Sequence, residues 1–288
     1  MCTYWGETMS DFGKKLDEAT IQNNFVFGKT MELYPDLCRR LLEIILNIEI
    51  AKIQYPEREK TIEARSDGKG IRLDVYVEDA KEERWFDVEM QVTDSTNFAK
   101  RMRYYQGLID PDKLKRGQHY SELGESFIIF ICPFDHFKQE RHVYTFRERC
   151  DQDMALALHD GATKIFLNTK GTYGDITPAL KTFLDYVDSG IVVGDFVSEL
   201  ANAVDSIKRN EKVRHDFMTL QMYLLEHELE TAQRRSEEIA LRLIRRGRPI
   251  EEIHEDTDIP LQRLRELARS NTARREIKSE SQDEAVLT

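Results

Sequence analysis

Two neighbouring segments in the first half of the chain have apolar residues at every second position. They are GIRLDVYVED (residues 70–79) and RWFDVEMQV (residues 84–92). Side chains of a β-strand point alternately to its two faces, so this spacing predicts two strands with one apolar face each. The short polar segment between them predicts a turn, and the two strands together predict a β-hairpin.

Apolar residues at helical spacing and continuous apolar runs predict the other elements of this part of the chain. Helices are expected over 35–50, 96–116 and 177–187, and strands over 126–134 and 162–169. Pro35 and Pro178 stand where a helix can begin, because the first turn needs no backbone N–H from proline. The order of these elements predicts a mixed α/β domain over residues 1–195.

Long helical patterns dominate the sequence from residue 196 onward. One of them spans residues 205–246 and could pair with a second copy of the chain or pack against its own core. Two shorter helical patterns follow around the turn DTDIP, in the outline of a helix-turn-helix. We therefore expect a helical region over 196–270 and a disordered polar tail over 271–288.

Composition narrows the class of protein. Charged residues make up 33% of the 288 residues, and no apolar run approaches the roughly 20 residues of a membrane span. The first residues lack the basic-then-apolar order of a signal peptide, so a cytoplasmic protein without membrane contact is expected. The four cysteines form no CxxC pair, which argues against a zinc site or a disulfide framework.

The net charge of −11, taken globally, argues against nucleic-acid binding, but one segment of the chain is basic. Its cations lie within residues 100–116 and are Lys100, Arg101, Arg103, Lys113, Lys115 and Arg116. Such a cluster can contact the phosphates of DNA, although a charge run is more often a solvated surface.

The polar face of the expected hairpin gathers side chains that could bind a metal. A turn centred on residues 81–82 places Asp74 opposite Glu89, with Cβ atoms about 5 Å apart, and Gln91 shares their face. Two carboxylates so close repel each other unless a cation lies between them, and such oxygen ligands suit Mg²⁺ or Mn²⁺. The alternative is a solvated sheet face, although aspartate is unfavourable within a strand. Asp87 is expected outside this group, nearer the turn.

Several segments resemble the PD-(D/E)XK nuclease superfamily and, within it, the bacterial recombination-promoting nuclease (Rpn) family, often described as transposases. Over residues 22–270 they are NNFVFGKTM, CRRLLEIIL, GIRLDVYVED, DVEMQV, KRMRYYQGLIDPDKLKRGQHYSELGESFIIFICPFD, YTFRERC and KIFLNTKG, in this order. The resemblance implies a restriction-endonuclease-like mixed sheet flanked by helices. It also implies a Mg²⁺- or Mn²⁺-dependent DNA endonuclease of low sequence specificity, linked to DNA recombination or mobile elements.

The resemblance assigns roles to individual residues as well. Asp74 falls at the family's first metal-binding aspartate, and Glu89 falls at its second acidic position. Gln91 stands where the superfamily more commonly has lysine; the Rpn family itself shows this form, and glutamine can orient a water but carries no charge. Glu43 is implied as a metal ligand from the first helix, with Glu63 as a weaker alternative.

Gln91 and the acidic net charge leave a second function open. The chain could be a catalytically weak or inactive DNA-binding or regulatory protein that keeps the nuclease fold. In both cases the expected partner is DNA, and the C-terminal helices could hold two copies of the chain together as a homodimer.

Overall fold

The protein, seen in a computed structural model, is described for residues 9–55, 61–62, 71–79, 81–114 and 116–270. It divides into two compact units, Met1–Phe217 and Met218–Thr288. The tail over 271–288, for which disorder was expected, lies outside the described residues. No helix among the described residues is long and apolar enough to cross a membrane.

The first unit is built on a five-stranded mixed sheet with the strand order β3-β4-β5-β9-β6. The strands are β3 (Val75–Asp79), β4 (Arg84–Met90), β5 (Glu125–Cys132), β9 (Ala162–Asn168) and β6 (Val143–Phe146). β3 and β4 are antiparallel, β4, β5 and β9 run parallel, and β6 returns antiparallel to β9. The hairpin, the central strand and the strand over 162–169 are therefore confirmed.

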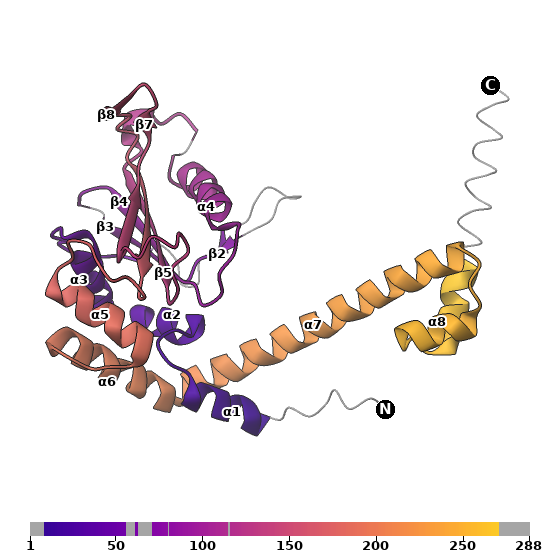
Figure 1. Cartoon of the computed structure of the whole chain (residues 1–288). Coiled ribbons are helices and arrows are strands. Elements are labelled where there is room, and N and C mark those ends of the chain that lie inside the picture. The colour runs from indigo at the N-terminus through magenta and orange to yellow at the C-terminus, as the bar shows by residue number, and fades with distance from the viewer. Residues whose placement is uncertain (1–8, 56–60, 63–70, 80, 115, 271–288) are drawn as a thin grey trace. The chain divides into compact units, whose positions relative to one another are not determined.

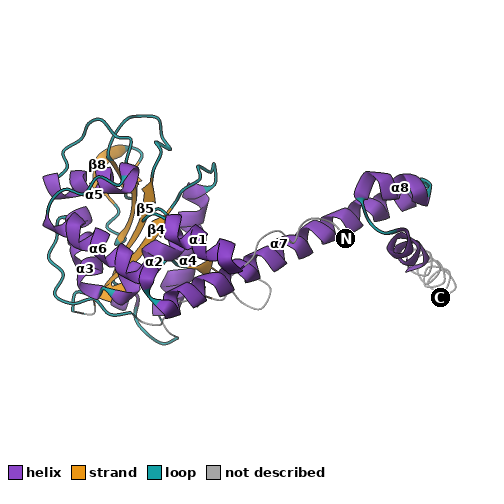
Figure 2. Cartoon of the chain, turned by 90° about the horizontal axis from the view of Figure 1, so that it is seen from below, coloured by secondary structure: helices purple, strands orange, loops and turns teal. Residues whose placement is uncertain are grey.

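Helices cover both faces of this sheet, as Figures 1 and 2 show from two directions. One face packs against α1 (Met9–Glu18), α2 (Asn24–Leu33), α3 (Pro35–Leu46), α5 (Pro178–Ser189) and α6 (Asp195–Arg209). The other face packs against α4 (Phe98–Lys113), whose apolar side chains join those of the sheet in a second core. The fold is thus a mixed α/β layer structure with a buried sheet.

The helix starts follow from the sequence. Pro35 and Pro178 each occupy the first turn of their helix, and the Thr177 hydroxyl accepts a hydrogen bond from Leu180 N at 3.2 Å. In α4, Pro111 lies inside the last turn, close to where the helix ends at Lys113. The three helices expected in this region are confirmed, with bounds that differ by a few residues.

The segment over residues 70–79 differs from its expected form. It is two strands, because β2 (Ile71–Arg72) pairs with β1 (Thr61–Ile62) in a separate small sheet, and β3 begins only at Val75. Leu73 is buried with Tyr76 under α4, whereas strict alternation placed it on the face of Val75. The irregular backbone at Leu73 and Asp74 breaks the alternation and turns Leu73 to the other side.

Several elements of the first unit were not predicted from the sequence. α1 is amphipathic, so its signal was present in the sequence. Those that carry no strong periodic signal are α2, the 3₁₀ turn η1 (Tyr120–Glu122), β6 and the small sheet of β7 (Arg149–Cys150) with β8 (Asp153–Ala157). β7 and β8 are largely exposed, so polar and apolar positions are not separated between two faces. Sequence periodicity therefore could not predict them.

The first unit extends to Phe217, beyond the boundary expected near residue 195. The reason is that α6 buries one face, including Phe196, Leu200 and Val204, in the first core. The start of the following helix α7 (Glu211–Arg245) also belongs to the first unit. Its Phe217 is 2% exposed, and the ring of Phe217 lies 5.2 Å from that of Phe25 in α2.

The second unit contains the rest of α7, α8 (Ile250–Thr257) and a further helix over 261–270. Asp258 ends α8 in the left-handed conformation with φ of 55°. A small core holds these helices together, formed by Ala240, Ile253, Ile259, Leu264 and Leu267. The chain thus ends its described part in two short helices around a tight turn, and their role as a DNA-binding helix-turn-helix stays a prediction.

Candidate active site

Asp74 and Glu89, the two carboxylates expected to lie together, are neighbours at the end of the hairpin away from its turn. The backbone N–H of Asp74 donates to Glu89 Oε1 at 3.1 Å, and the backbone N–H of Met90 donates to Asp74 Oδ2 at 3.2 Å. Each carboxylate is thereby tied to the backbone of the opposite strand. The irregular backbone before β3 makes this possible, since the N–H of Asp74 points to a side chain.

Gln91 extends this group beyond the end of β4. Its Nε2 donates to Glu89 Oε2 at 3.2 Å, and its Oε1 accepts from Arg101 Nη1 at 2.8 Å. Arg101 Nη2 also lies 3.5 Å from Glu89 Oε2. The amide of Gln91 thus bridges a carboxylate and a guanidinium, and it presents its oxygen toward the cation.

Arg101 is held in place by α4 and the sheet. Its Nη2 donates to the hydroxyl of Tyr105 at 2.9 Å. The guanidinium carbon lies 5.7, 5.5 and 5.4 Å from the ring centroids of Phe98, Tyr105 and Phe130, within range of cation–π attraction. Arg101 therefore places a fixed positive charge beside Glu89, while 37% of its side chain stays exposed.

The start of α2 approaches the same point from the other side. Asn24 Nδ2 donates to Asp74 Oδ2 at 3.0 Å. A Cβ atom on Gly28, one turn later, would lie 3.0 Å from the carbonyl oxygen of Asp74, so this helix face meets the strand at its closest approach. Sequence reasoning did not select Asn24; the available signal was its place in NNFVFGKTM.

The polar face of β4 is buried, which rules out an ordinary solvated sheet face. Asp87, Glu89 and Gln91 are 1%, 2% and 6% exposed, because α4 covers them. Burial raises the pKa of Glu89 to about 8, with a further contribution from the charge of Asp74. The Asp74 N–H, Arg101 and Gln91 act in the opposite direction. Glu89 thus lies in an environment that opposes its own negative charge even with Arg101 beside it.

Asp87 lies on this same buried face, although the sequence placed it outside the group. It pairs with Tyr76 on β3 and with Ile128 on β5, both of which face α4. Among the described residues neither of its carboxylate oxygens has a hydrogen-bond partner. Burial raises the pKa of Asp87 well above its ordinary value, and the charges of Glu89 and Asp74 add to this. The alternation of β4 showed on which face of the strand Asp87 lies. That this face is buried follows only from the position of α4.

The expected role of Glu43 needs correction. Both of its carboxylate oxygens accept hydrogen bonds from Arg39 Nη1 at 2.8 Å, and Oε1 accepts another from Ile50 N at 3.0 Å. It lines a hollow with Arg84, at the turn end of the hairpin. Glu89 lies five residues further along β4, about 16 Å away at the usual rise of a strand. Glu43 is therefore not placed to share a metal with Glu89.

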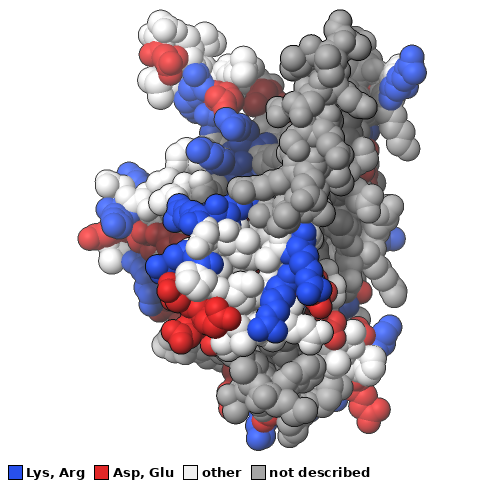
Figure 3. Space-filling model, turned by 90° about the vertical axis from the view of Figure 1, so that its right-hand side faces the viewer, with Lys and Arg blue, Asp and Glu red and all other residues white. Residues whose placement is uncertain are grey.

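The cations of the basic cluster over residues 100–116 differ in how exposed they are. Lys113 is 12% exposed and its Nζ lies 3.5 Å from the ring centroid of Trp85, so it is less accessible than the other cations, and its phosphate contact stays a prediction. Those that remain exposed are Lys100, Arg103 and Arg116. On the face drawn in Figure 3, Lys and Arg side chains form patches beside acidic ones rather than one continuous basic surface. Lys115 and Glu63 lie outside the described residues.

The donor set fits a hard divalent cation. Among the described residues, no group of three or more His, Cys, Asp and Glu side chains is placed to hold a metal. Mg²⁺, however, commonly takes one or two carboxylates and keeps several waters, so Asp74 and Glu89 can suffice. A divalent cation between them would also offset the repulsion and burial that raise the pKa of Glu89.

Comparison with known proteins gives one match. A family model described as "PD-(D/E)XK nuclease family transposase" matches residues 24–171, just over half of the 288-residue chain. No curated protein and no solved structure gives a significant match. The matched range begins at Asn24 and includes Asp74, Glu89, Gln91 and Arg101.

Proposed function

Because the chain belongs to the PD-(D/E)XK nuclease family of transposases, we propose that it is a Mg²⁺- or Mn²⁺-dependent DNA endonuclease. The observation that carries the proposal is the pair of hydrogen bonds that ties Asp74 to β4: its N–H donates to the carboxylate of Glu89, and its own carboxylate accepts from the N–H of Met90. The two acidic side chains are thereby held next to each other, and Glu89 is almost fully buried. Burying a charged carboxylate next to a second one lowers the stability of the folded state unless a cation binds between them. Asp74, Glu89 and Gln91 are the proposed catalytic residues, and the first two are the proposed metal ligands.

The chain's own groups divide the work of phosphodiester hydrolysis. A bound divalent cation would supply Lewis acidity and a water of lowered pKa. Asp74 and Glu89 would hold it, and Asn24 and the N–H of Met90 keep the Asp74 carboxylate oriented. Gln91 can orient a water through its amide, and Arg101 supplies the positive charge that a lysine at position 91 would have carried.

We further infer that the substrate is contacted mainly through its phosphates. Lys100, Arg103 and Arg116 are exposed cations on or next to α4, and Arg101 lies among them at the site. Phosphate contacts carry no sequence information, which supports cleavage with low sequence preference. This behaviour would suit a nuclease of the Rpn type that promotes recombination in the bacterial cytoplasm.

The test of the catalytic residues is cleavage of supercoiled plasmid in Mg²⁺ or Mn²⁺. Asp74→Asn and Glu89→Gln keep shape and hydrogen bonding but remove charge, so each should lower the rate about 100-fold or more. Glu82→Gln, in the exposed hairpin turn, is the matched control and should cut like the wild type. Wild-type rates in both site variants would refute the assignment.

Metal binding can be measured without cleavage. Mn²⁺ should raise the melting temperature of the wild type, because a ligand that binds only the folded state stabilises it. The increase should be absent in Glu89→Gln and present in Glu82→Gln. An equal increase in all three proteins would place the metal elsewhere.

A second function, DNA binding without cleavage, is favoured by one contact. Arg101 Nη2 lies 3.5 Å from Glu89 and Nη1 bonds to Gln91, so a positive charge adjoins the site without any metal. Salt-sensitive DNA binding, with no cutting in either metal and no shift of the melting temperature by Mn²⁺, would select this function.

We also propose that α7 contributes to a homodimer. Exposed apolar side chains occur along its part beyond Phe217, including Met222, Tyr223, Leu224 and Ile239. Exposed apolar surface of this kind can be covered by a second copy of the helix. Light scattering coupled to size exclusion measures the mass directly, and a monomer at micromolar concentration would exclude it.

A further inference from the structure

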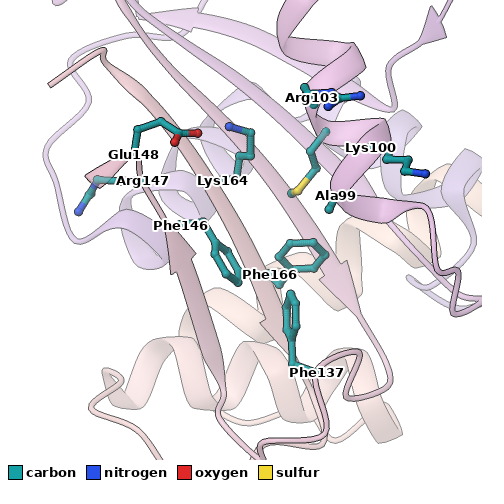
Figure 4. Close-up of a pocket in the computed structure, with 10 residues that line it drawn as sticks. Ala99, Lys100, Arg103, Phe137, Phe146, Arg147, Glu148, Lys164 and Phe166 are labelled. Atoms are coloured by element: carbon teal, nitrogen blue, oxygen red, sulfur yellow. The ribbon is translucent and has the colours of Figure 1, made fainter. Parts of the chain in front are cut away.

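A cavity of about 480 Å³ lies beside α4, where the sheet extends past that helix as β9 and β6. Figure 4 shows its lining, with aromatic rings from β6, β9 and the preceding loop on one side and the first turns of α4 on the other. The volume lies within the ~300–1,000 Å³ typical of small-ligand pockets. None of the proposed metal ligands lines it.

The floor of this pocket is aromatic. Phe166 of β9 is 3% exposed, and its ring centroid lies 4.9 Å from that of Phe137 and 6.0 Å from that of Phe146. Phe146, opposite Lys164 on the edge strand β6, is 44% exposed. An exposed ring packed beside the buried ring of Phe166 and the half-buried ring of Phe137 offers a flat surface for stacking.

The rim of the pocket is basic. Lys100 and Arg103 are three residues apart on α4 and share one side of the helix, with their charged ends directed outward from the aromatic floor, and Lys164 projects from β9 (Figure 4). Within the described part of the chain none of the three forms an ion pair. Glu148 is the acidic residue of the described lining.

Arg147 is also near the pocket but does not contribute to the rim. Its guanidinium points away from the cavity in Figure 4, and its Nε donates to Thr163 on the opposite face of the sheet. The rim thus holds three cations and one carboxylate, in a chain whose net charge is −11. This local reversal of charge favours an anionic ligand.

We propose that this pocket binds an unstacked base of single-stranded DNA, with the base on Phe146 and the flanking phosphates on Lys100, Arg103 and Lys164. Stacking on exposed aromatic rings beside cations is the general way in which proteins hold single strands. The choice of DNA as ligand rests on the proposed function. Arg101, between Lys100 and Arg103 in sequence, contacts Glu89, so a strand in the pocket would pass along α4 beside the candidate active site.

The experiment measures binding of a fluorescent oligo-dT of about 12 nucleotides in EDTA, so that cleavage plays no part. Phe146→Leu keeps an apolar side chain but removes the ring, and it should weaken binding about tenfold. Phe146→Trp should bind at least as tightly as the wild type. Tyr120→Leu, which removes an exposed ring from η1, is the control and should leave the affinity unchanged.

The cationic rim is tested by the salt dependence of the same binding. Lys164→Ala should reduce the slope of log affinity against log salt by somewhat less than one, as expected for one lost phosphate contact on a single strand. Loss of affinity in Phe146→Leu that Phe146→Trp does not show supports the pocket. Equal affinity in Phe146→Leu and the wild type, with or without an effect of Lys164→Ala, overturns it.

Failure of this inference and failure of the proposed function give different results. If the chain binds oligo-dT through Phe146 but never cuts DNA, the pocket stands and the endonuclease assignment does not. If it cuts plasmid through Asp74 and Glu89 but Phe146→Leu leaves the affinity for oligo-dT unchanged, only the pocket is refuted.

Discussion

At the scale of single residues, the candidate site brings three carboxylates close together. Asp87 and Glu89 are buried on one face of β4, and Asp74 adjoins Glu89 from the irregular backbone just before β3. Arg101 contacts this group through Glu89 and Gln91. A buried carboxylate without a partner keeps its proton or destabilises the fold. Asp87 is the residue at which this conflict can be measured.

We predict that Asp87→Asn stabilises the metal-free protein at pH 8. Burial raises the pKa of Asp87 in the folded state above the value near 3.8 that it has when unfolded. Its favourable contribution is therefore complete below that pH and is lost as the pH rises toward the folded-state pKa. Asparagine has no proton to lose, so at pH 8 the variant should gain at least about 1 kcal/mol in the free energy of unfolding.

The measurement is urea unfolding in EDTA at pH 4, 6 and 8. The difference between variant and wild type should grow from near zero at the lowest pH to its largest value at the highest. Asp175→Asn changes an exposed carboxylate and should show no such trend. A constant difference at all three values, or a destabilised variant at pH 8, would contradict the buried protonated state of Asp87.

Sequence alone reaches only part of this residue-level picture. The juxtaposition of Asp74 and Glu89 follows from the position of the turn and the two-residue period of a strand, and the register Val75↔Val88 agrees with it. The contact with Arg101 and the burial of Asp87 depend on where α4 lies, which no local pattern specifies. Glu43 was misplaced for the same reason, since helical spacing does not tell which end of a strand a helix side chain reaches.

At the scale of elements, strands with a clear apolar pattern could be predicted from the sequence. Features that depend on contacts with other parts of the fold could not. β5 and β9 could be predicted from their continuous apolar runs, which arise because helices cover both faces of the sheet. β6 lies at the edge with two exposed residues of four, so its pattern is weak. The break between β2 and β3 has no signal in the alternation either. It exists because the Asp74 backbone bonds to Glu89 instead of continuing the ladder.

The close approach between the hairpin turn and the start of β5 gives a prediction at this scale. A Cβ atom on Gly124 would lie 1.8 Å from the carbonyl oxygen of Glu83, a backbone atom that cannot rotate away. Gly124→Ala should therefore displace β5 from the hairpin turn and lower the free energy of unfolding by about 1–3 kcal/mol.

The matched control is Gly107→Ala on the exposed side of α4. No atom lies within 4 Å of a Cβ atom there, within the contacts that the structure describes. Alanine loses less backbone entropy than glycine in a helix, so this variant should gain about 0.5–1 kcal/mol. Thermal unfolding followed by circular dichroism compares the two, and equal effects of the same sign would show that the approach at Gly124 is not tight.

At the scale of the whole molecule, the helices after residue 195 serve two different units. α6 and the first turns of α7 complete the core of the nuclease-like unit, and the remaining helices form a small core of their own. The helical character of this region was visible in the sequence, but the boundary was not. A helix that covers another helix and one that belongs to a separate unit have the same amphipathic pattern.

This division predicts how the chain tolerates truncation. A variant that ends at residue 225 keeps the buried face of α6 together with Val213 and Phe217, and it should melt cooperatively like the corresponding transition of the full chain. A variant that ends at Gly194 loses this whole face. Each such side chain contributes about 1.5–3 kcal/mol by burial, so the summed loss is as large as the ~5–15 kcal/mol stability of a typical domain.

The shorter variant should accordingly be unfolded or aggregated, while the longer one stays folded and cuts plasmid if the nuclease-like unit acts alone. Circular dichroism and light scattering give fold and mass, and plasmid cleavage gives function. If the variant ending at Gly194 melts cooperatively at the temperature of the longer one, α6 is not part of the first unit.

If the variant ending at residue 225 folds but binds DNA much more weakly than the full chain, the helices around Asp258 supply the missing affinity. In that case the second unit is the DNA-targeting module that its two short helices suggest.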